Sequence, residues 1–350
     1  MKTQVLEILR VCGIFSLTRA LSAAKPRILV YHNFSATSGG GNSVGVPELR
    51  YQLEYLRRHF QVVKLSELCR QLASGRPMRN VAALTVDDGR RNFYEFLYPL
   101  LKEFQLPATF FVVSSFISQR DWLWTDKVLW LSEQPNRAPE LGPNKLPAFF
   151  ARLNGMPPEA RNACIDSFAR GMGSSIPKHA PPPYAPCSWR ELREMCDSGL
   201  VEIGAHTLTH PILSTLRDHE SAHEIRASRA ELEEQLGQSV TLFGIPNGTY
   251  KDYRPSQLKQ IRDAGYAGAA TALSGLVGAD VDPYQLPRIG IAAWTNNVRF
   301  GARVDGVEHY RNRLRNALQR VSTAVRDDRY SKPEAVVTKF SDCLLSGPRR

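Results

Sequence analysis

Short apolar runs alternate with amphipathic stretches along much of this chain. The helical stretches repeat apolar residues every three or four positions, as Leu49, Leu53 and Leu56 do within residues 47–60. The runs have the length and β-branched content of buried strands, and we expect them at residues 27–32, 62–63, 81–86, 108–113, 201–204, 240–246, 266–271 and 285–291. This β–α alternation predicts a parallel sheet or barrel.

The alternation stops between residues 116 and 187. Eleven of the chain's 23 prolines fall in residues 135–186, so we expect an insertion that leaves the barrel and holds short helices at most. Its entrance carries Trp122, Trp124 and Trp130. Tryptophans beside a sugar site can stack on pyranose faces, although packing of the insertion onto the barrel is their commoner use. The sequence Ser188-Trp189-Arg190-Glu191 predicts a capping box that restarts regular structure.

The sequence divides into three expected parts. Residues 27–294 form the barrel with its insertion, and residues 295–350 form a basic, partly helical extension without a known motif. Residues 1–26 are amphipathic, and Glu7, Arg10 and Arg19 interrupt their apolar positions, which leaves an uncharged run too short to span a bilayer. We therefore expect residues 1–26 to lie on the barrel or on a membrane surface.

Composition narrows the choice of partners and compartment. The formal net charge of +11 and the pI near 9.5 favour an anionic neighbour, such as phospholipid head groups, a lipid-linked pyrophosphate or an acidic glycan. A nucleic acid is not expected, because no array of basic and aromatic residues occurs. The six cysteines include no C-x-x-C pair and suggest no disulfide framework, which fits a reducing compartment and predicts a cytoplasmic protein at, or near, the inner face of a membrane.

Two strand ends carry the residues of a metal site. The run 81–86 leads into Asp87-Asp88-Gly89, and the run 201–204 leads into a loop with His206 and His210. Asp-Asp-Gly alone is ordinary turn chemistry, and a lone His-x-x-x-His is as often structural. Together, two imidazoles and a carboxylate supply the three ligands that a catalytic divalent cation, most often Zn²⁺, requires.

In combination these motifs resemble the polysaccharide deacetylase family with its NodB homology domain. The similarity rests on Thr85-Val86-Asp87-Asp88-Gly89, Ala108-Thr109-Phe110-Phe111-Val112, His206-Thr207-Leu208-Thr209-His210 and Phe243-Gly244-Ile245-Pro246-Asn247-Gly248-Thr249-Tyr250. The resemblance implies a distorted (β/α) barrel and metal-dependent removal of N-acetyl groups from amino sugars.

The resemblance also implies roles for individual residues. Asp88, His206 and His210 would bind the metal and Asp87 would be the general base, while the backbone amide of Asn247 would stabilise the oxyanion. Residues expected to contact the substrate are His32, Pro246, Tyr250 and Trp124.

The chain departs from the family pattern in two places. Gly244 stands where an arginine often precedes the proline of the third motif, so the group that orients the base must come from elsewhere. Arg288 is our candidate, with a surface arginine as the alternative. The late Leu-x-His motif of the usual general acid is absent, and His309, the last histidine, does not follow a strand. The proton donor is therefore unassigned.

Two other classes of function stay open. His219-Glu220-Ser221-Ala222-His223 matches the H-E-x-x-H helix of zinc proteases, but both histidines fall on a polar helix face beside Arg226. The missing acid would also suit a catalytically degenerate barrel that binds glycan, whereas the pair Asp87-Asp88 argues for an enzyme. The sequence thus favours a deacetylase acting on an N-acetylated glycan or a lipid-linked glycan precursor of exopolysaccharide or surface-glycan metabolism.

Overall fold

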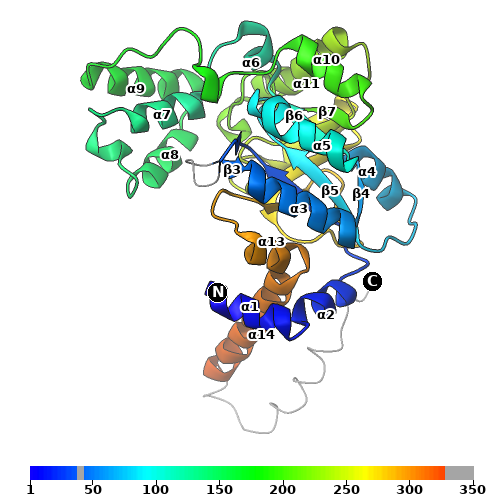
Figure 1. Cartoon of the computed structure of the whole chain (residues 1–350). Coiled ribbons are helices and arrows are strands. Elements are labelled where there is room, and N and C mark those ends of the chain that lie inside the picture. The colour runs from blue at the N-terminus through cyan, green and yellow to red at the C-terminus, as the bar shows by residue number, and fades with distance from the viewer. Residues whose placement is uncertain (38–42, 328–350) are drawn as a thin grey trace.

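The computed structural model describes residues 1–37 and 43–327, and its centre is a closed barrel of seven parallel strands (Figure 1). The ring runs β1-β10-β9-β8-β7-β6-β5 and closes because β5 also pairs with β1, while β4 pairs with β5 beside the ring. The strands are β1 (Arg27–Tyr31), β4 (Gln61–Val63), β5 (Val81–Val86), β6 (Ala108–Val112), β7 (Val201–Ala205), β8 (Leu242–Gly244), β9 (Gly268–Ser274) and β10 (Leu286–Gly290). The predicted (β/α) barrel is confirmed.

Strand register brings the expected site residues to one rim. Tyr31 aligns with Val86, and Ala205 aligns with Val112 on one side and with Phe243 on the other. The residues that directly follow β1, β5, β7 and β8 therefore meet at the carboxyl ends of the strands, where barrel enzymes hold their chemistry.

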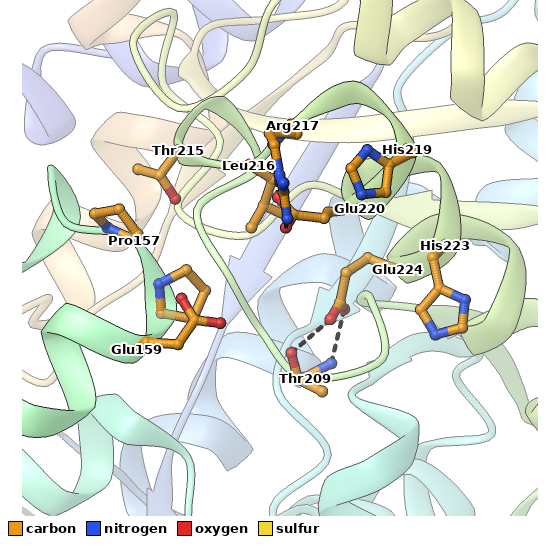
Figure 2. A pocket seen from close by; sticks show the side chains of 11 residues that line it. Pro157, Glu159, Thr209, Thr215, Leu216, Arg217, His219, Glu220, His223 and Glu224 are labelled. Atoms are coloured by element: carbon orange, nitrogen blue, oxygen red, sulfur yellow. Dashed lines mark hydrogen bonds and ion pairs between the residues drawn. The ribbon is translucent and has the colours of Figure 1, made fainter.

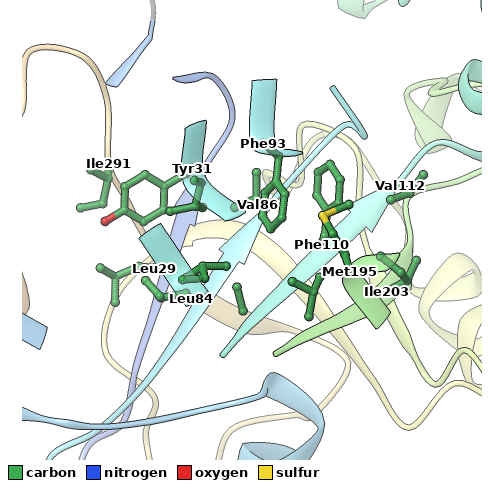
Figure 3. Packing of buried hydrophobic residues seen from close by; sticks show 14 of the residues in the cluster. Leu29, Tyr31, Leu84, Val86, Phe93, Phe110, Val112, Met195, Ile203 and Ile291 are labelled. Carbon is green, nitrogen blue, oxygen red and sulfur yellow. The ribbon is translucent and has the colours of Figure 1, made fainter. Parts of the chain in front are cut away.

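Amphipathic helices cover the barrel and fill its outer core. Residues on one face of α3 are buried, as the spacing of Leu49, Leu53 and Leu56 predicts. Between strands and helices the packing is aromatic and aliphatic: the Phe93 ring stacks on Phe110 with centroids 4.2 Å apart (Figure 3). The covering helices are α3 (Val46–His59), α4 (Leu65–Ala73), η1 (Phe93–Leu97), α5 (Tyr98–Phe104), α10 (Trp189–Asp197), α11 (Asp218–Leu236) and α12 (Pro255–Asp263). The capping box at Ser188 and Glu191 is present.

The insertion is more regular than its sequence predicts. Its helices are α6 (Ser114–Gln119), α7 (Trp124–Glu133), α8 (Leu146–Asn154) and α9 (Pro158–Gly171), and α7, α8 and α9 lie to one side of the barrel in Figure 1. The expectation of short helices at most is wrong for α9, which has 14 residues. Prolines stand in the first turns of α8 and α9, where no intrahelical N–H is required, so they begin helices instead of breaking them. The insertion buries an apolar cluster of its own that includes Val128, Leu153 and Ile165.

Helices from the two ends of the described chain pack together beyond the barrel (Figure 1). They are α1 (Thr3–Val11), α2 (Ile14–Leu21), α13 (Asn297–Val304) and α14 (Val307–Asp327). Their shared core includes Leu6, Phe15 and Val298, and Arg19 lies 3.0 Å from the buried carboxylate of Asp305. Residues 328–350 of the predicted extension lie outside the described residues. None of the helices in the described ranges has both the length and the apolar character needed to cross a bilayer.

Candidate active site

Asp88, His206 and His210 form a compact buried group at the barrel rim. Asp88 Oδ1 lies 3.7 Å from His206 Nε2 and 3.5 Å from His210 Nε2, and all three residues are buried. One ligand atom from each lies within 4.8 Å of the others, and no second group of three or more such ligands occurs in the described ranges. The structure therefore brings together the three predicted metal ligands.

Local backbone geometry and hydrogen bonds aim these ligands. Asp88 and His210 have positive φ angles of 86° and 60°, which re-aim each side chain at its strand or loop end. His206 Nδ1 lies 2.8 Å from the Gly244 carbonyl oxygen, so the ring's Nε2 is left for a ligand. The buried His210 Nδ1 has no hydrogen-bond partner among the described residues.

The charge states at this group suit a divalent cation. Burial lowers the pKa of His210 to about 3 and also lowers the pKa of His206, so both imidazoles are neutral near pH 7. Burial would raise the pKa of Asp88, but the Arg90 guanidinium outweighs it and keeps this carboxylate ionised. Two neutral imidazoles and one carboxylate with converging donor atoms fit a zinc-type cation.

Arg90, an arginine that the sequence motifs do not reveal, binds the carboxylate of Asp88. Arg90 donates to Asp88 Oδ2 and, through Nε at 3.0 Å and Nη2 at 2.5 Å, to both oxygens of Asp126. Asp126 lies on α7 and is fully buried, so the insertion contributes a buried charge that supports the site. No sequence motif links Asp126 to Arg90, because the contact depends on how the insertion folds back.

Trp124 does not offer a surface to a sugar. Its side chain is 5% exposed, its indole N–H donates to the His210 carbonyl at 3.0 Å, and the Arg161 guanidinium lies 4.4 Å from its ring centre. The expectation that Trp124 binds substrate is therefore corrected: the indole packs the insertion against the loop that carries a metal ligand. Packing was the commoner alternative for these tryptophans.

Asp87, the expected base, is held by Arg288. The two guanidinium Nη atoms donate to the two carboxylate oxygens at 2.7 Å each, and Arg288 Nε donates to the Thr271 carbonyl at 2.7 Å. Arg288 is 2% exposed, which rules out the surface alternative. Burial would raise the pKa of Asp87, but Arg288 and His206 outweigh it and hold this pKa below its usual value. Asp87 is thus an oriented carboxylate beside the metal-ligand group.

The close packing beside His206 explains why residue 244 is a glycine. A Cβ atom at this position would lie 2.9 Å from His206 Nδ1 and 2.9 Å from Phe111 Cγ, so the site has no room for a side chain there. Gly244 on β8 carries no side chain that could orient Asp87, and the guanidinium that binds Asp87 comes from Arg288 on β10.

The other expected substrate residues lie at different distances from this centre. His32 Nε2 is 3.8 Å from Asp87 Oδ2, and the His32 side chain is half-exposed. Pro246 is buried next to the exposed Asn247, whose φ of 59° turns the loop. Tyr250 is 74% exposed and lines a separate cavity of about 450 Å³, formed mainly by α12, to which no residue of the metal-ligand group contributes.

The H-E-x-x-H segment forms no metal site. His219 and His223 are exposed on α11 and line a cavity of about 610 Å³ (Figure 2). Neither belongs to a group of three potential ligands in the described part of the chain. Nearby, the Glu224 carboxylate accepts from the amides of Leu208 at 2.8 Å and Thr209 at 2.9 Å, and it thereby fixes the loop between the two metal-ligand histidines. The zinc-protease alternative is wrong.

A barrel rim that combines an Asp-His-His group with a second, arginine-held carboxylate has the composition of a hydrolase site. The chain belongs to the polysaccharide deacetylase family, whose family model matches residues 74–269. His32 and Arg288 lie outside the matched residues, at the two ends of the barrel sequence.

Individual relatives agree with this assignment. The chain is 21% identical to the putative polysaccharide deacetylase YxkH of Bacillus subtilis over 81% of this chain and 78% of that protein. A shorter match, 35% identical over 77 residues, covers 21% of this chain and 12% of the poly-β-1,6-N-acetyl-D-glucosamine N-deacetylase of Escherichia coli.

Solved structures share the fold. The Streptococcus pyogenes deacetylase PplD, in complex with acetate, superposes with a TM-score of 0.57 at 19% identity, over 81% of this chain and 99% of that one. IcaB from Ammonifex degensii gives the same TM-score and identity, over 81% of this chain and 97% of that one.

Proposed function

We propose that this protein removes N-acetyl groups from amino sugars of a polysaccharide or glycan precursor in a reaction that depends on a divalent cation, with Zn²⁺ the expected metal. The observation that carries the proposal is the pairing of Asp87, held by Arg288, with the adjacent Asp88-His206-His210 group. A degenerate binding barrel would not require an oriented, ionised carboxylate next to a cation site. The relatives named for poly-β-1,6-N-acetyl-D-glucosamine support an exopolysaccharide substrate.

Each residue has a defined task in the proposed reaction. A cation held by Asp88, His206 and His210 would acidify a water and polarise the acetamide carbonyl. Asp87 accepts the proton of the attacking water, and Arg288 keeps its two oxygens in a fixed orientation. The Asn247 backbone amide donates to the oxyanion; within the described residues no hydrogen bond occupies that amide.

His32 is our candidate for the missing proton donor. Its Nε2 lies 3.8 Å from Asp87 Oδ2, and its side chain is half-exposed at the rim of the barrel. The leaving group of an amide is an amine that needs a proton, whereas the alkoxide of an acetyl ester leaves more readily without one. His32→Gln should therefore lower kcat on an N-acetyl substrate much more than on an O-acetyl ester, and an equal loss on both would contradict this role.

The central experiment measures acetate released from N-acetylglucosamine oligomers together with bound metal. Wild-type protein should release acetate when loaded with zinc, and His206→Ala/His210→Ala should lose both metal and activity. His219→Ala/His223→Ala is the matched control and should keep both, because these histidines lie on the exposed face of α11. Asp87→Asn should keep the metal and lose turnover. Metal binding by wild type without acetate from any N-acetylated glycan would favour the degenerate barrel.

We also propose a peripheral position at the cytoplasmic face of a membrane, where a lipid-linked glycan precursor would be presented. The outer faces of α1 and α2 expose a row of apolar side chains: Val5, Ile8, Val11, Leu17 and Leu21. Exposed basic residues also occur at the start of α1, on α1 itself and on α14, among them Lys2, Arg10, Arg311 and Arg313. Exposed apolar side chains together with exposed basic ones suit an anionic lipid surface.

Vesicle sedimentation tests this position. The protein should sediment with phosphatidylglycerol vesicles and much less with phosphatidylcholine vesicles, and Ile8→Glu/Val11→Glu should abolish sedimentation while acetate release from soluble oligomers continues. Equal sedimentation of the variant and the wild type would rule out this surface.

A further inference from the structure

Two neighbouring cavities are lined by His32, and the larger one also by Arg288, the residues that lie next to Asp87. A cavity of about 310 Å³ includes Asn33 and Trp294 in its lining, and a second of about 550 Å³ includes Arg288 and Asn312. Both cavities are also lined by Val30, His32, Gly290 and Arg303, so they adjoin each other along these shared residues. We call the two cavities together the β1/β10 groove. It begins at His32 and Arg288, the two side chains that flank Asp87, and it runs under α13 and α14.

Trp294 is the exposed aromatic residue of this groove. Its side chain is 59% exposed, and it lies in the loop between β10, which ends at Gly290, and α13, which begins at Asn297. The turn that carries it is fixed, because Thr295 N donates to the Ala292 carbonyl at 2.8 Å and Ala292 N donates to Thr295 Oγ1 at 3.1 Å. The Arg303 guanidinium lies 4.5 Å from the ring centre. The indole is thus held in position while much of its surface is left to solvent.

We propose that Trp294 is a stacking platform for a sugar ring next to the one that is deacetylated, so that α13 and α14 help to select oligomeric over monomeric substrates. This inference rests on the proposed function. A pyranose presents an apolar face of C–H groups and an edge of hydroxyls, and it therefore binds where an aromatic face lies among amides and cations. The β1/β10 groove combines Trp294 with the side chains of Asn33, Asn312, Asn316 and Arg303.

Trp294 lies away from the residues that would carry out the reaction, so it can contribute to substrate binding without taking part in catalysis. Among the described residues, the aromatic ring of Trp294 lies against the guanidinium groups of Arg299 and Arg303 and not against Asp87, Asp88, His206 or His210, whereas the groove that it lines reaches His32 and Arg288. A substrate with a single sugar at the cation would not extend to Trp294, but an oligomer lying in the groove would. Loss of the indole should therefore act on KM for oligomers and leave monomer turnover unchanged.

The test compares Trp294→Ala, Trp294→Phe and the control Leu314→Ala, which removes an exposed apolar side chain (61%) from α14 outside the groove lining. Acetate release is measured on N-acetylglucosamine and on its tetramer, and tetramer binding is measured by calorimetry with each variant in an Asp87→Asn background. Trp294→Ala should raise KM and Kd for the tetramer by about tenfold, Trp294→Phe should restore most of the loss, and Leu314→Ala should match the wild type.

The outcomes separate this inference from the proposed function. If Trp294→Ala leaves the tetramer Kd unchanged, or lowers kcat equally on monomer and tetramer, the platform is ruled out. If the wild type releases no acetate from either substrate, the proposed activity fails, but the calorimetric comparison still decides whether Trp294 binds sugar.

Discussion

The guanidinium of Arg288 binds both oxygens of Asp87 although the two residues lie 201 positions apart in the sequence. The contact joins the end of β5 to the middle of β10 across the closed barrel. A buried carboxylate that accepts two charge-assisted hydrogen bonds stays ionised and keeps one orientation. The arginine that holds Asp87 therefore comes from β10, and the sequence around Gly244 on β8 supplies none.

Removing the Arg288 guanidinium should lower the catalytic rate and leave metal binding unchanged. In Arg288→Gln the lowering of the Asp87 pKa by Arg288 is lost and burial then dominates, so the acid limb of the pH–rate profile should move to higher pH. We expect kcat near pH 7 to fall on the order of 100-fold, with bound zinc unchanged. Arg58→Gln, which alters an exposed arginine paired with Glu54, is the control. An unmoved acid limb would show that Arg288 has no such role.

The buried ion pairs Asp88–Arg90 and Arg90–Asp126 link the insertion to the cation site, so we predict that the insertion increases metal affinity. Asp126→Asn removes a carboxylate that holds the Arg90 guanidinium, and Arg90 in turn loses its fixed position against Asp88. Loss of such outer support reduces metal affinity by roughly 10- to 100-fold. Competition with a chelator measures the change, and Asp166→Asn, at an exposed position of α9, should behave as wild type. An identical chelator midpoint for Asp126→Asn and wild type would contradict the prediction.

The sequence predicted those site residues that directly follow a strand or share one short loop. Asp87 and Asp88 follow a buried run directly, and His206 and His210 share one loop, so strand order alone brings them to the rim. The Arg90–Asp126 pair was missed because it depends on the path of the insertion. Trp124 was misassigned because the residue type does not reveal whether the indole faces solvent or the His210 carbonyl.

The helices of the insertion show a second limit of prediction from the sequence alone. A high proline content usually indicates irregular structure, but Pro147 and Pro158 stand in the first turns of α8 and α9, where proline is well tolerated. The burial of residues such as Leu153 and Ile165 then stabilises these helices by packing, which the local composition does not reveal.

Gly244→Ala tests the claim that β8 has no room for a side chain beside His206. A methyl group at this position would lie 2.9 Å from His206 Nδ1, and the imidazole would have to move away from the Gly244 carbonyl that orients it. We expect a loss of about 1–3 kcal/mol in the free energy of unfolding, as overpacked sites show, together with weaker zinc binding. Urea denaturation and chelator competition measure the two effects. Gly278→Ala, where a Cβ would meet nothing within 4 Å, is the control, and equal behaviour of the two variants would refute the steric argument.

His309 should make the protein sensitive to mild acid independently of the cation site. It lies half-buried on α14, with Nε2 3.5 Å from Lys25 Nζ, and burial, then Lys25 and Arg313, lower its pKa from 6.5 to about 4. Below pH 6.5 the unfolded chain takes up a proton at this residue, whereas the folded protein does so only near pH 4. Folding therefore loses free energy at this residue as the pH falls from about 6.5 to 4. Glu308, the acidic neighbour on α14, pairs with Arg303.

His309→Gln removes this titration, so its free energy of unfolding should fall less between pH 7.5 and pH 5 than that of the wild type. Urea denaturation of the zinc-loaded proteins at both pH values measures the difference, and zinc loading keeps the contribution of His206 and His210 the same in both. His179→Gln, at an exposed position of the insertion, should follow the wild type. If His309→Gln and wild type lose the same free energy of unfolding between the two pH values, His309 does not contribute to the acid sensitivity of the fold.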